Sequence, residues 1–347
     1  MRRRRFYVVL AVVAIAAALV VVVALRHAAP PEAARLLPEA DGVLYVDLRL
    51  VRLFGQMTEL PDVTQEREYE EFVRQTGIQV ERDLAEAAIA MHAPEAAPAV
   101  KGGKPAPAVL EPRFSQILVG KFNSEKLAAY LSKLARNKEQ YRDREIFHIP
   151  SEERTVRVCI LGADTVAVSN TASAREMHGM VDRYRAKASP ASGSALVAEH
   201  YARIPVGSLA WAMARSEEAP GGLEWLPLRI ALPGEVTWVA SARYTGALHL
   251  RLEAIAASAA DAKQLSEQAR TLLGLYRSVE GSVPQAAADA DVKAFVDSLE
   301  VQQEENRTLV TGTLTQGFIE KALAQPPAAA APVEEVPAGG KGAAPKK

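Results

Sequence analysis

The chain has 347 residues, and its formal net charge of −1 argues against a general nucleic-acid-binding protein, which needs a basic surface. A single cysteine, Cys159, leaves no partner for an internal disulfide, so an exported domain of this sequence must be stabilised by packing. The length is sufficient for about two folded domains with real cores.

The N-terminal segment predicts a membrane anchor. Residues 1–5 carry four arginines, and residues 6–25 contain no charged side chain. Twenty helical residues span about 30 Å, the hydrocarbon thickness of a bilayer. The arginines are expected to stay in the cytoplasm as a short basic stub, so the rest of the chain lies outside it. The lipid bilayer is therefore an expected partner, through a transmembrane helix over residues 6–25.

A cleaved signal peptide is the competing interpretation of the same segment. Its apolar region is usually 7–15 residues long and ends at a small-x-small cleavage site. The apolar run here is longer, and Arg26 and His27 occupy the upstream position of a cleavage site after Ala28 or Ala29. We therefore favour an uncleaved anchor.

The first half of the exported part predicts an α+β subdomain over residues 37–186, preceded by a stalk over 26–36. An Ala/Pro/Gly-rich stretch, 93–112, predicts a mobile loop because it has few large apolar groups. Ser173 and Glu176 form a capping-box pattern before a helix. The expected strands cover residues 43–49, 87–92, 113–122, 145–149, 155–161 and 165–170, and the last two form a hairpin. Asn123 or Ser124 is expected to cap a helix that carries Leu127, Leu131, Leu134 and Ala135 on one face.

The second half predicts a related subdomain over residues 196–324, after a linker over 187–195 and before a disordered tail over 325–347. Residues 236–244 and 247–256 alternate as an antiparallel pair. Its core face is expected to carry Leu248, Leu250 and Leu252, and its solvent face His249, Arg251 and Glu253. The hairpin–helix unit 156–177 matches the unit 299–320, which suggests an internal duplication. The fold class predicted is thus an anchor helix followed by two related α+β subdomains with mainly antiparallel sheets.

Nothing in the sequence identifies catalytic, cofactor-binding or metal-binding residues. The six histidines lack the i, i+4 spacing of a helical zinc site, and no HExxH, CxxC, GxSxG or phosphate-loop motif occurs. Acidic pairs such as Glu70-Glu71 and Glu304-Glu305 are expected on solvated surfaces. Cys159 lies in an apolar strand and is expected to be a small buried hydrophobe. We therefore expect no cofactor, and an enzyme is not favoured.

One local feature is a candidate partner-contact patch. The connection 220–227 is irregular but rich in large apolar side chains, and such a segment either folds over the core or meets a partner. Trp211 and Trp238 are instead expected in core strands. The patch consists of Leu223, Trp225, Leu226 and Leu228.

The segments LPEADGVLYVDLRLVR, RFSQILVGKFNSEKLAAYL and RTVRVCILGADTVAVSN resemble those of uncharacterised, single-pass membrane-anchored bacterial proteins of domain-of-unknown-function type. The resemblance implies an exported, two-part α+β body on the bacterial inner membrane and supplies no activity. We expect a non-catalytic binding or structural module of the envelope, with an envelope protein as a candidate partner. A tethered hydrolase and a small-ligand binder, each with a site between the two subdomains, are the alternatives.

Overall fold

The computed structural model describes residues 29–55, 67–93, 113–151, 154–189, 192–216, 223–225, 228–230, 234–280 and 290–319. The predicted anchor over 6–25, the tail over 325–347 and most of the loop over 93–112 lie outside these residues. Among the helices that are described, none combines the length and apolarity needed to cross a bilayer.

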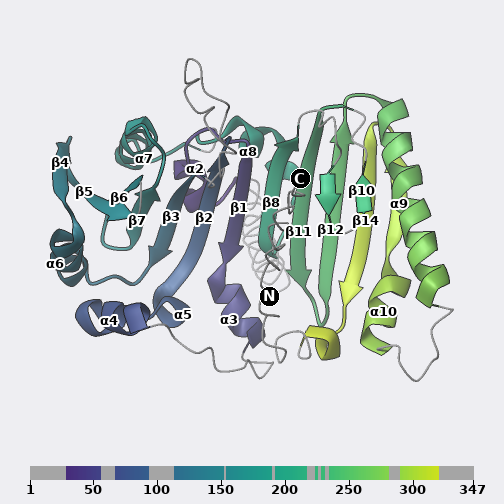
Figure 1. Cartoon of the computed structure of the whole chain (residues 1–347), viewed down its shortest axis with the longest axis horizontal. Coiled ribbons are helices and arrows are strands. Elements are labelled where there is room, and N and C mark those ends of the chain that lie inside the picture. Colours follow the sequence, from purple (N-terminus) through teal and green to yellow (C-terminus); the bar gives the residue numbers. More distant parts are fainter. Residues whose placement is uncertain are drawn as a thin grey trace, which may run out of the picture.

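A twelve-stranded antiparallel sheet forms the centre of the molecule (Figure 1). This confirms the predicted α+β class with antiparallel strands. A separate two-stranded hairpin pairs β9 (Leu223–Trp225) with β10 (Leu228–Ile230). In spatial order the large sheet contains β13 (Glu300–Glu304), β14 (Arg307–Leu314), β12 (Leu248–Ala256), β11 (Val236–Tyr244), β8 (Ser208–Ser216), β1 (Gly42–Asp47), β2 (Leu84–His92), β3 (Arg113–Gly120), β7 (Thr165–Ser169), β6 (Arg154–Ile160), β5 (Arg144–Ser151) and β4 (Asn137–Tyr141).

The two halves of the chain share this single sheet and join where β1 pairs with β8. Outward from that pair, the first half has the order β1-β2-β3-β7-β6 and the second half the order β8-β11-β12-β14-β13. The two orders correspond strand for strand. The first half adds the hairpin β4–β5 at its outer edge.

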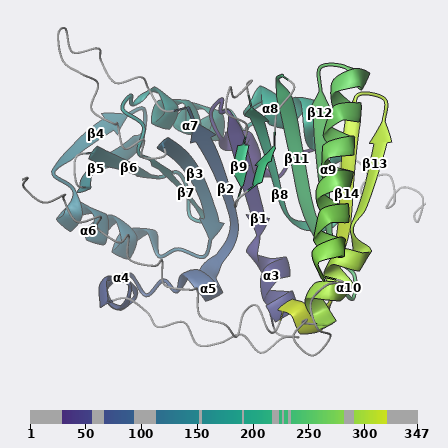
Figure 2. The same ribbon diagram turned by 45° about the vertical axis from the view of Figure 1, so that its right-hand side comes forward.

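Helices cover both faces of the sheet. Strand register places Tyr45, Trp211 and Ile146 on one face, under α2 (Glu32–Leu36), α7 (Arg175–Arg185) and α8 (Ala195–His200). The opposite face packs against α6 (Ser124–Leu134) in the first half and against α9 (Ala259–Glu280) in the second. Figure 2 shows α9 lying along β12 and β14. The remaining helices are α3 (Leu48–Gly55), α4 (Arg67–Thr76), α5 (Val80–Asp83), the 3₁₀ turn η1 (Tyr201–Arg203) and α10 (Ala290–Ser298).

Several predicted elements occur as expected. The hairpin through residues 162–164 joins β6 to β7, and β11 pairs with β12 over nine residues on each strand. Cys159 is fully buried, and burial raises the pKa of its thiol to about 12, which makes it an inert core residue. Asn123 caps α6, since its side chain accepts a hydrogen bond from the Lys126 amide.

Two local expectations differ from the structure. Residues 32–36, expected within a stalk, form α2, and Leu36 in this helix is fully buried in the main core. The helix predicted after Ser173 begins at Arg175, and Ser173 Oγ accepts from the Arg175 amide instead of closing a capping box. Glu176 turns inward and accepts a hydrogen bond from Thr171.

The two sets of β12 side chains lie on opposite faces as predicted, but the exposure expected at Leu252 and Glu253 is wrong. Glu253 is 1 % exposed, whereas Leu252 is 36 % exposed. The reason is a set of ion pairs to the Glu253 carboxylate, from Arg203, Arg251 and Arg307. A carboxylate that is surrounded by guanidinium groups can be buried, because the pairs compensate for its lost hydration.

Candidate functional site

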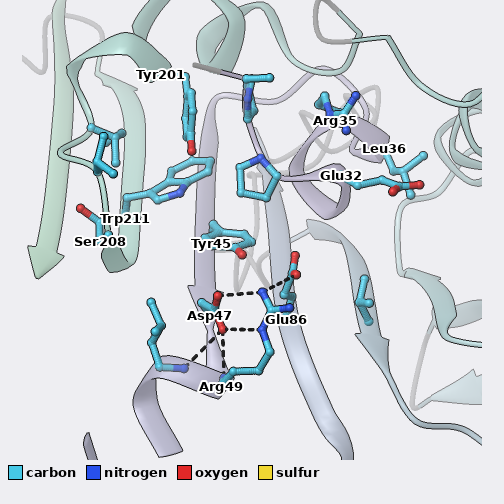
Figure 3. A pocket seen from close by; sticks show the side chains of 18 of the residues that line it. Glu32, Arg35, Leu36, Tyr45, Asp47, Arg49, Glu86, Tyr201, Ser208 and Trp211 are labelled. Atoms are coloured by element: carbon cyan, nitrogen blue, oxygen red, sulfur yellow. Dashed lines mark hydrogen bonds and ion pairs between the residues drawn. The ribbon is translucent and has the colours of Figure 1, made fainter. Parts of the chain in front are cut away.

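A cavity of about 980 Å³ lies where the two halves meet (Figure 3). Its walls come from α2, β1, β2 and the start of α3 in the first half, and from η1 and β8 in the second. Residues of both halves are therefore needed to form it. The side chains that decide its chemistry are Tyr45, Asp47, Arg49, Glu86, Tyr201 and Trp211.

An aromatic cluster forms one wall of the cavity. Tyr45 of β1 and Trp211 of β8 are direct partners across the β1–β8 pair, so their side chains lie on the same face. Their rings stack with centroids 5.4 Å apart, and Tyr201 meets Trp211 edge-on at 5.7 Å. Burial raises the pKa of both tyrosines, and Glu86 and Asp47 add to the effect at Tyr45. Both phenols are thus kept protonated.

A charged group lies beside the aromatic wall. Arg49 Nη2 contacts Asp47 Oδ2 at 2.8 Å and Glu86 Oε1 at 2.7 Å. Asp47 Oδ1 also accepts from the backbone N–H of Arg49 and so helps to begin α3. Burial raises the pKa of Glu86, against the opposing influence of Arg49. Hydrogen bonding to Asp47 raises the pKa of Arg49, whose side chain is 56 % exposed.

The cavity lining is acidic overall. Among the described residues that line it, four carboxylates and two guanidinium groups give a formal charge of −2. These groups are Glu32, Asp47, Glu86 and Asp164, with Arg35 and Arg49. The site therefore favours neutral or cationic ligands over anions.

Two other polar clusters lie away from the cavity. His92 Nε2 is 3.0 Å from Ser115 Oγ, but Ser115 is fully buried and also contacts Ser169 Oγ at 3.1 Å. Glu139 lies between His148, at 3.2 Å, and His178, at 2.6 Å. Burial alone would raise the pKa of Glu139, but the hydrogen bonds from the two histidines hold it below its usual value.

These clusters do not form a recognisable centre of chemistry. A buried Ser115 cannot reach a substrate, and none of the described histidines lines the cavity. Among the described residues, no group of three or more His, Cys, Asp or Glu is arranged to hold a metal ion. His178 is half-buried and stacks on Tyr141 with ring centroids 3.8 Å apart.

The sequence did not single out the residues of the cavity. Trp211 was expected in the core and is 2 % exposed, while Tyr45, Asp47 and Glu86 attracted no assignment. Strand alternation was the one sequence signal that could have grouped cavity residues, because Tyr45 and Asp47 are two positions apart in a strand and therefore share a face. In the predicted contact patch, Leu223, Trp225 and Leu228 lie in β9 and β10, but the patch's side chains lie outside the described part of the chain.

Comparison with known proteins gives no family. No family model and no curated protein matches the chain. Solved structures of TP0453 are similar at low identity: crystal form III has 10 % identity and a TM-score of 0.44, and covers 85 % of this chain and 99 % of that one. Crystal form I has 12 % identity, the same TM-score, and coverage of 85 % and 97 %. At this distance the likeness assigns neither family nor function.

Proposed function

We propose that this chain is a membrane-tethered binding protein of the bacterial envelope, and that its folded body holds a small ligand in the cavity between its two halves. The observation that carries the proposal is the cavity of about 980 Å³, with an aromatic wall and a few charged groups. Ligand sites in proteins commonly have this size.

The position of the cavity supports a binding role. Tyr45 and Trp211 are buried in the main core, so the aromatic wall is held by packing on both sides of the β1–β8 pair. Arg49 fixes both Asp47 and Glu86. A wall of this kind is rigid before a ligand arrives, and a rigid site loses less entropy on binding.

The hydrolase alternative has less support. A hydrolytic site needs a nucleophile or an activated water beside a free base. Ser208 lines the cavity, but its hydroxyl donates to the Pro205 carbonyl at 2.7 Å, and no described histidine adjoins it. The cavity carboxylates of Asp47 and Glu86 are paired with Arg49, which disfavours either as a general base.

The membrane anchor is part of the proposal and rests on the apolar run over residues 6–25. Ala29, Pro30 and Pro31 line the cavity, so an anchor ending at residue 25 leaves three residues before the cavity wall. Membrane fractionation with alkaline extraction tests the anchor. The full-length chain is expected in the extracted membrane pellet, and recovery in the soluble fraction would contradict the anchor.

The matching strand orders of the two halves support a further part of the proposal, that they are related by internal duplication. The correspondence includes the helix after the third strand, which is α6 in the first half and α9 in the second. The cavity then lies at the junction of two similar units, where β1 meets its counterpart β8.

Photolabelling tests the binding site itself. Benzophenone is a small aromatic ketone that cross-links to nearby C–H bonds on illumination. In the full-length chain in lipid nanodiscs, we expect saturable labelling of peptides that line the cavity. Ser208→Trp should block it by filling the space, whereas Leu134→Trp, at an exposed position on α6, should leave it unchanged. Unsaturable labelling spread over the surface, equal in both variants, would refute the binding function.

A further inference from the structure

Two carboxylates in the cavity wall share a single arginine (Figure 3). Asp47 of β1 and Glu86 of β2 are direct partners across the two strands, so their side chains lie next to each other on one face. Arg49 contacts both and adds one positive charge to two negative ones. The group therefore keeps a formal charge of −1, and like charges directly opposite each other in a sheet are destabilising.

The two carboxylates are partly accessible and only partly hydrated. The side chains of Asp47 and Glu86 are 14 % and 15 % exposed, and both residues line the cavity. Burial raises the pKa of Glu86, so the contact with Arg49 does not fully replace the hydration that the charged form has lost. A second cation in the cavity would supply the missing compensation.

Glu253 shows how the same sheet compensates a buried carboxylate with its own residues. Three guanidinium groups, from Arg203, Arg251 and Arg307, contact that one carboxylate. In the cavity wall the proportion is reversed, because two carboxylates share one guanidinium group. The rest of the described lining adds two further carboxylates and one further guanidinium group. The shortage of positive charge therefore coincides with the cavity.

The lining also offers apolar contacts to the body of a ligand. Leu50 from the first half and Ile204 and Val206 from the second line the cavity, and Val206 is 62 % exposed. An organic cation contacts these side chains as well as the carboxylates, whereas a bare metal ion does not. Among the described residues, no group of three or more His, Cys, Asp or Glu is arranged to hold such an ion.

We infer that the cavity takes an organic cation, with a primary ammonium group that donates hydrogen bonds to the carboxylates of Asp47 and Glu86 and with an apolar or aromatic body. This inference rests on the proposed function and adds the chemical class of the ligand. A hydrogen bond between charged groups contributes about fivefold to tenfold more to affinity than one between neutral groups.

Matched competitors test the inference in the full-length chain in phosphatidylcholine nanodiscs. Cavity labelling by benzophenone is inhibited with two diphenylmethanes of nearly equal size. One carries an aminomethyl group, which is charged at neutral pH, and the other a hydroxymethyl group. The measured quantity is the half-inhibiting concentration of the alcohol divided by that of the amine, both as free aqueous concentrations. In the wild type this ratio should exceed one, and a diphenylmethane carboxylate should inhibit more weakly than the alcohol.

Two variants connect the ratio to the carboxylates. In Asp47→Asn we expect it to fall about fivefold to tenfold. Asparagine keeps the oxygen that accepts from the Arg49 backbone N–H, so the start of α3 is retained. Glu267→Gln removes the same charge from a side chain on α9 that is 62 % exposed, and it should leave the ratio unchanged. If Asp47→Asn does not fold, Glu86→Gln removes the other carboxylate charge and should lower the ratio in the same way.

The outcomes separate this inference from the proposed function. Saturable cavity labelling with the same ratio in wild type and variants would leave the binding function standing and overturn the ammonium–carboxylate contact. Inhibition by the alcohol or the carboxylate at lower concentrations than the amine would overturn the cationic class. Absence of cavity labelling would overturn both.

Discussion

At the scale of single residues, Glu253 shows how a buried charge can be stabilised. Three arginines from η1, β12 and β14 surround its carboxylate, and their own side chains remain about one third exposed. Each arginine keeps contact with water while the carboxylate does not. The alternation of β12 predicts a solvated glutamate. This prediction fails because Arg203 and Arg307, which are distant in the chain, meet Glu253 only in the fold.

Glu253→Gln tests this cluster. Removal of the carboxylate charge leaves three guanidinium groups without their common partner, and we expect unfolding free energy to fall by about 2–4 kcal/mol. Urea unfolding measures the loss. Glu267→Gln is the matched control on α9, where the side chain is 62 % exposed, and it should change stability by less than about 0.5 kcal/mol. Equal small effects for both variants would show that the buried cluster adds no stability.

Glu86 predicts a pH dependence of stability. Burial raises the pKa of Glu86 in the folded state, so the protonated carboxyl favours the folded protein. This contribution to the unfolding free energy is fully present below the pKa of the unfolded state, and it is lost as the pH rises through the pKa of the folded state. Glu86→Gln does not titrate. The stability of this variant relative to wild type should therefore increase between about pH 4 and pH 7, as measured by urea unfolding at each pH. A difference that falls or stays constant over that range would contradict the assignment.

At the scale of elements, local pattern predicts hairpins well and edge elements poorly. The pairs β6–β7 and β11–β12 follow from alternation and a short turn. The strand β4 was missed because NKEQY is polar, as suits the outermost strand of a sheet, and its turn needs a positive φ at Arg142. The helix α2 was missed because five residues after a proline pair give almost no periodic signal.

Leu36→Ala tests whether α2 is part of the core. Leu36 is fully buried among residues of both halves, and its truncation should cost about 2–5 kcal/mol of unfolding free energy. Leu134→Ala, at a position 43 % exposed on α6, is the control and should cost less than about 1 kcal/mol. A stalk that stands apart from the body would make the two substitutions equivalent in thermal or urea unfolding.

At the scale of the whole molecule, the two predicted subdomains share one sheet and one main core. That core includes Leu36, Ile117 and Cys159 from the first half and Trp211 and Val239 from the second. The sequence shows two similar halves, but the pairing of β1 with β8 joins residues more than 160 positions apart and leaves no local pattern. The cavity was unpredictable for the same reason, since its walls meet only through that pair.

A shared core predicts one cooperative unfolding transition. Cys159 is the single cysteine and lies in the first half, while all three tryptophans lie in the second. Thiol labelling of Cys159 and tryptophan fluorescence should therefore report the same urea midpoint. Midpoints separated by more than about 0.5 M would indicate two independently folding subdomains instead.

The most direct test of ligand binding between the halves is a crystal structure of the full-length protein saturated with benzophenone. The expected result is density for both rings within the cavity beside Trp211 and Tyr201. A cavity that contains only water in crystals saturated with the ketone would contradict the account.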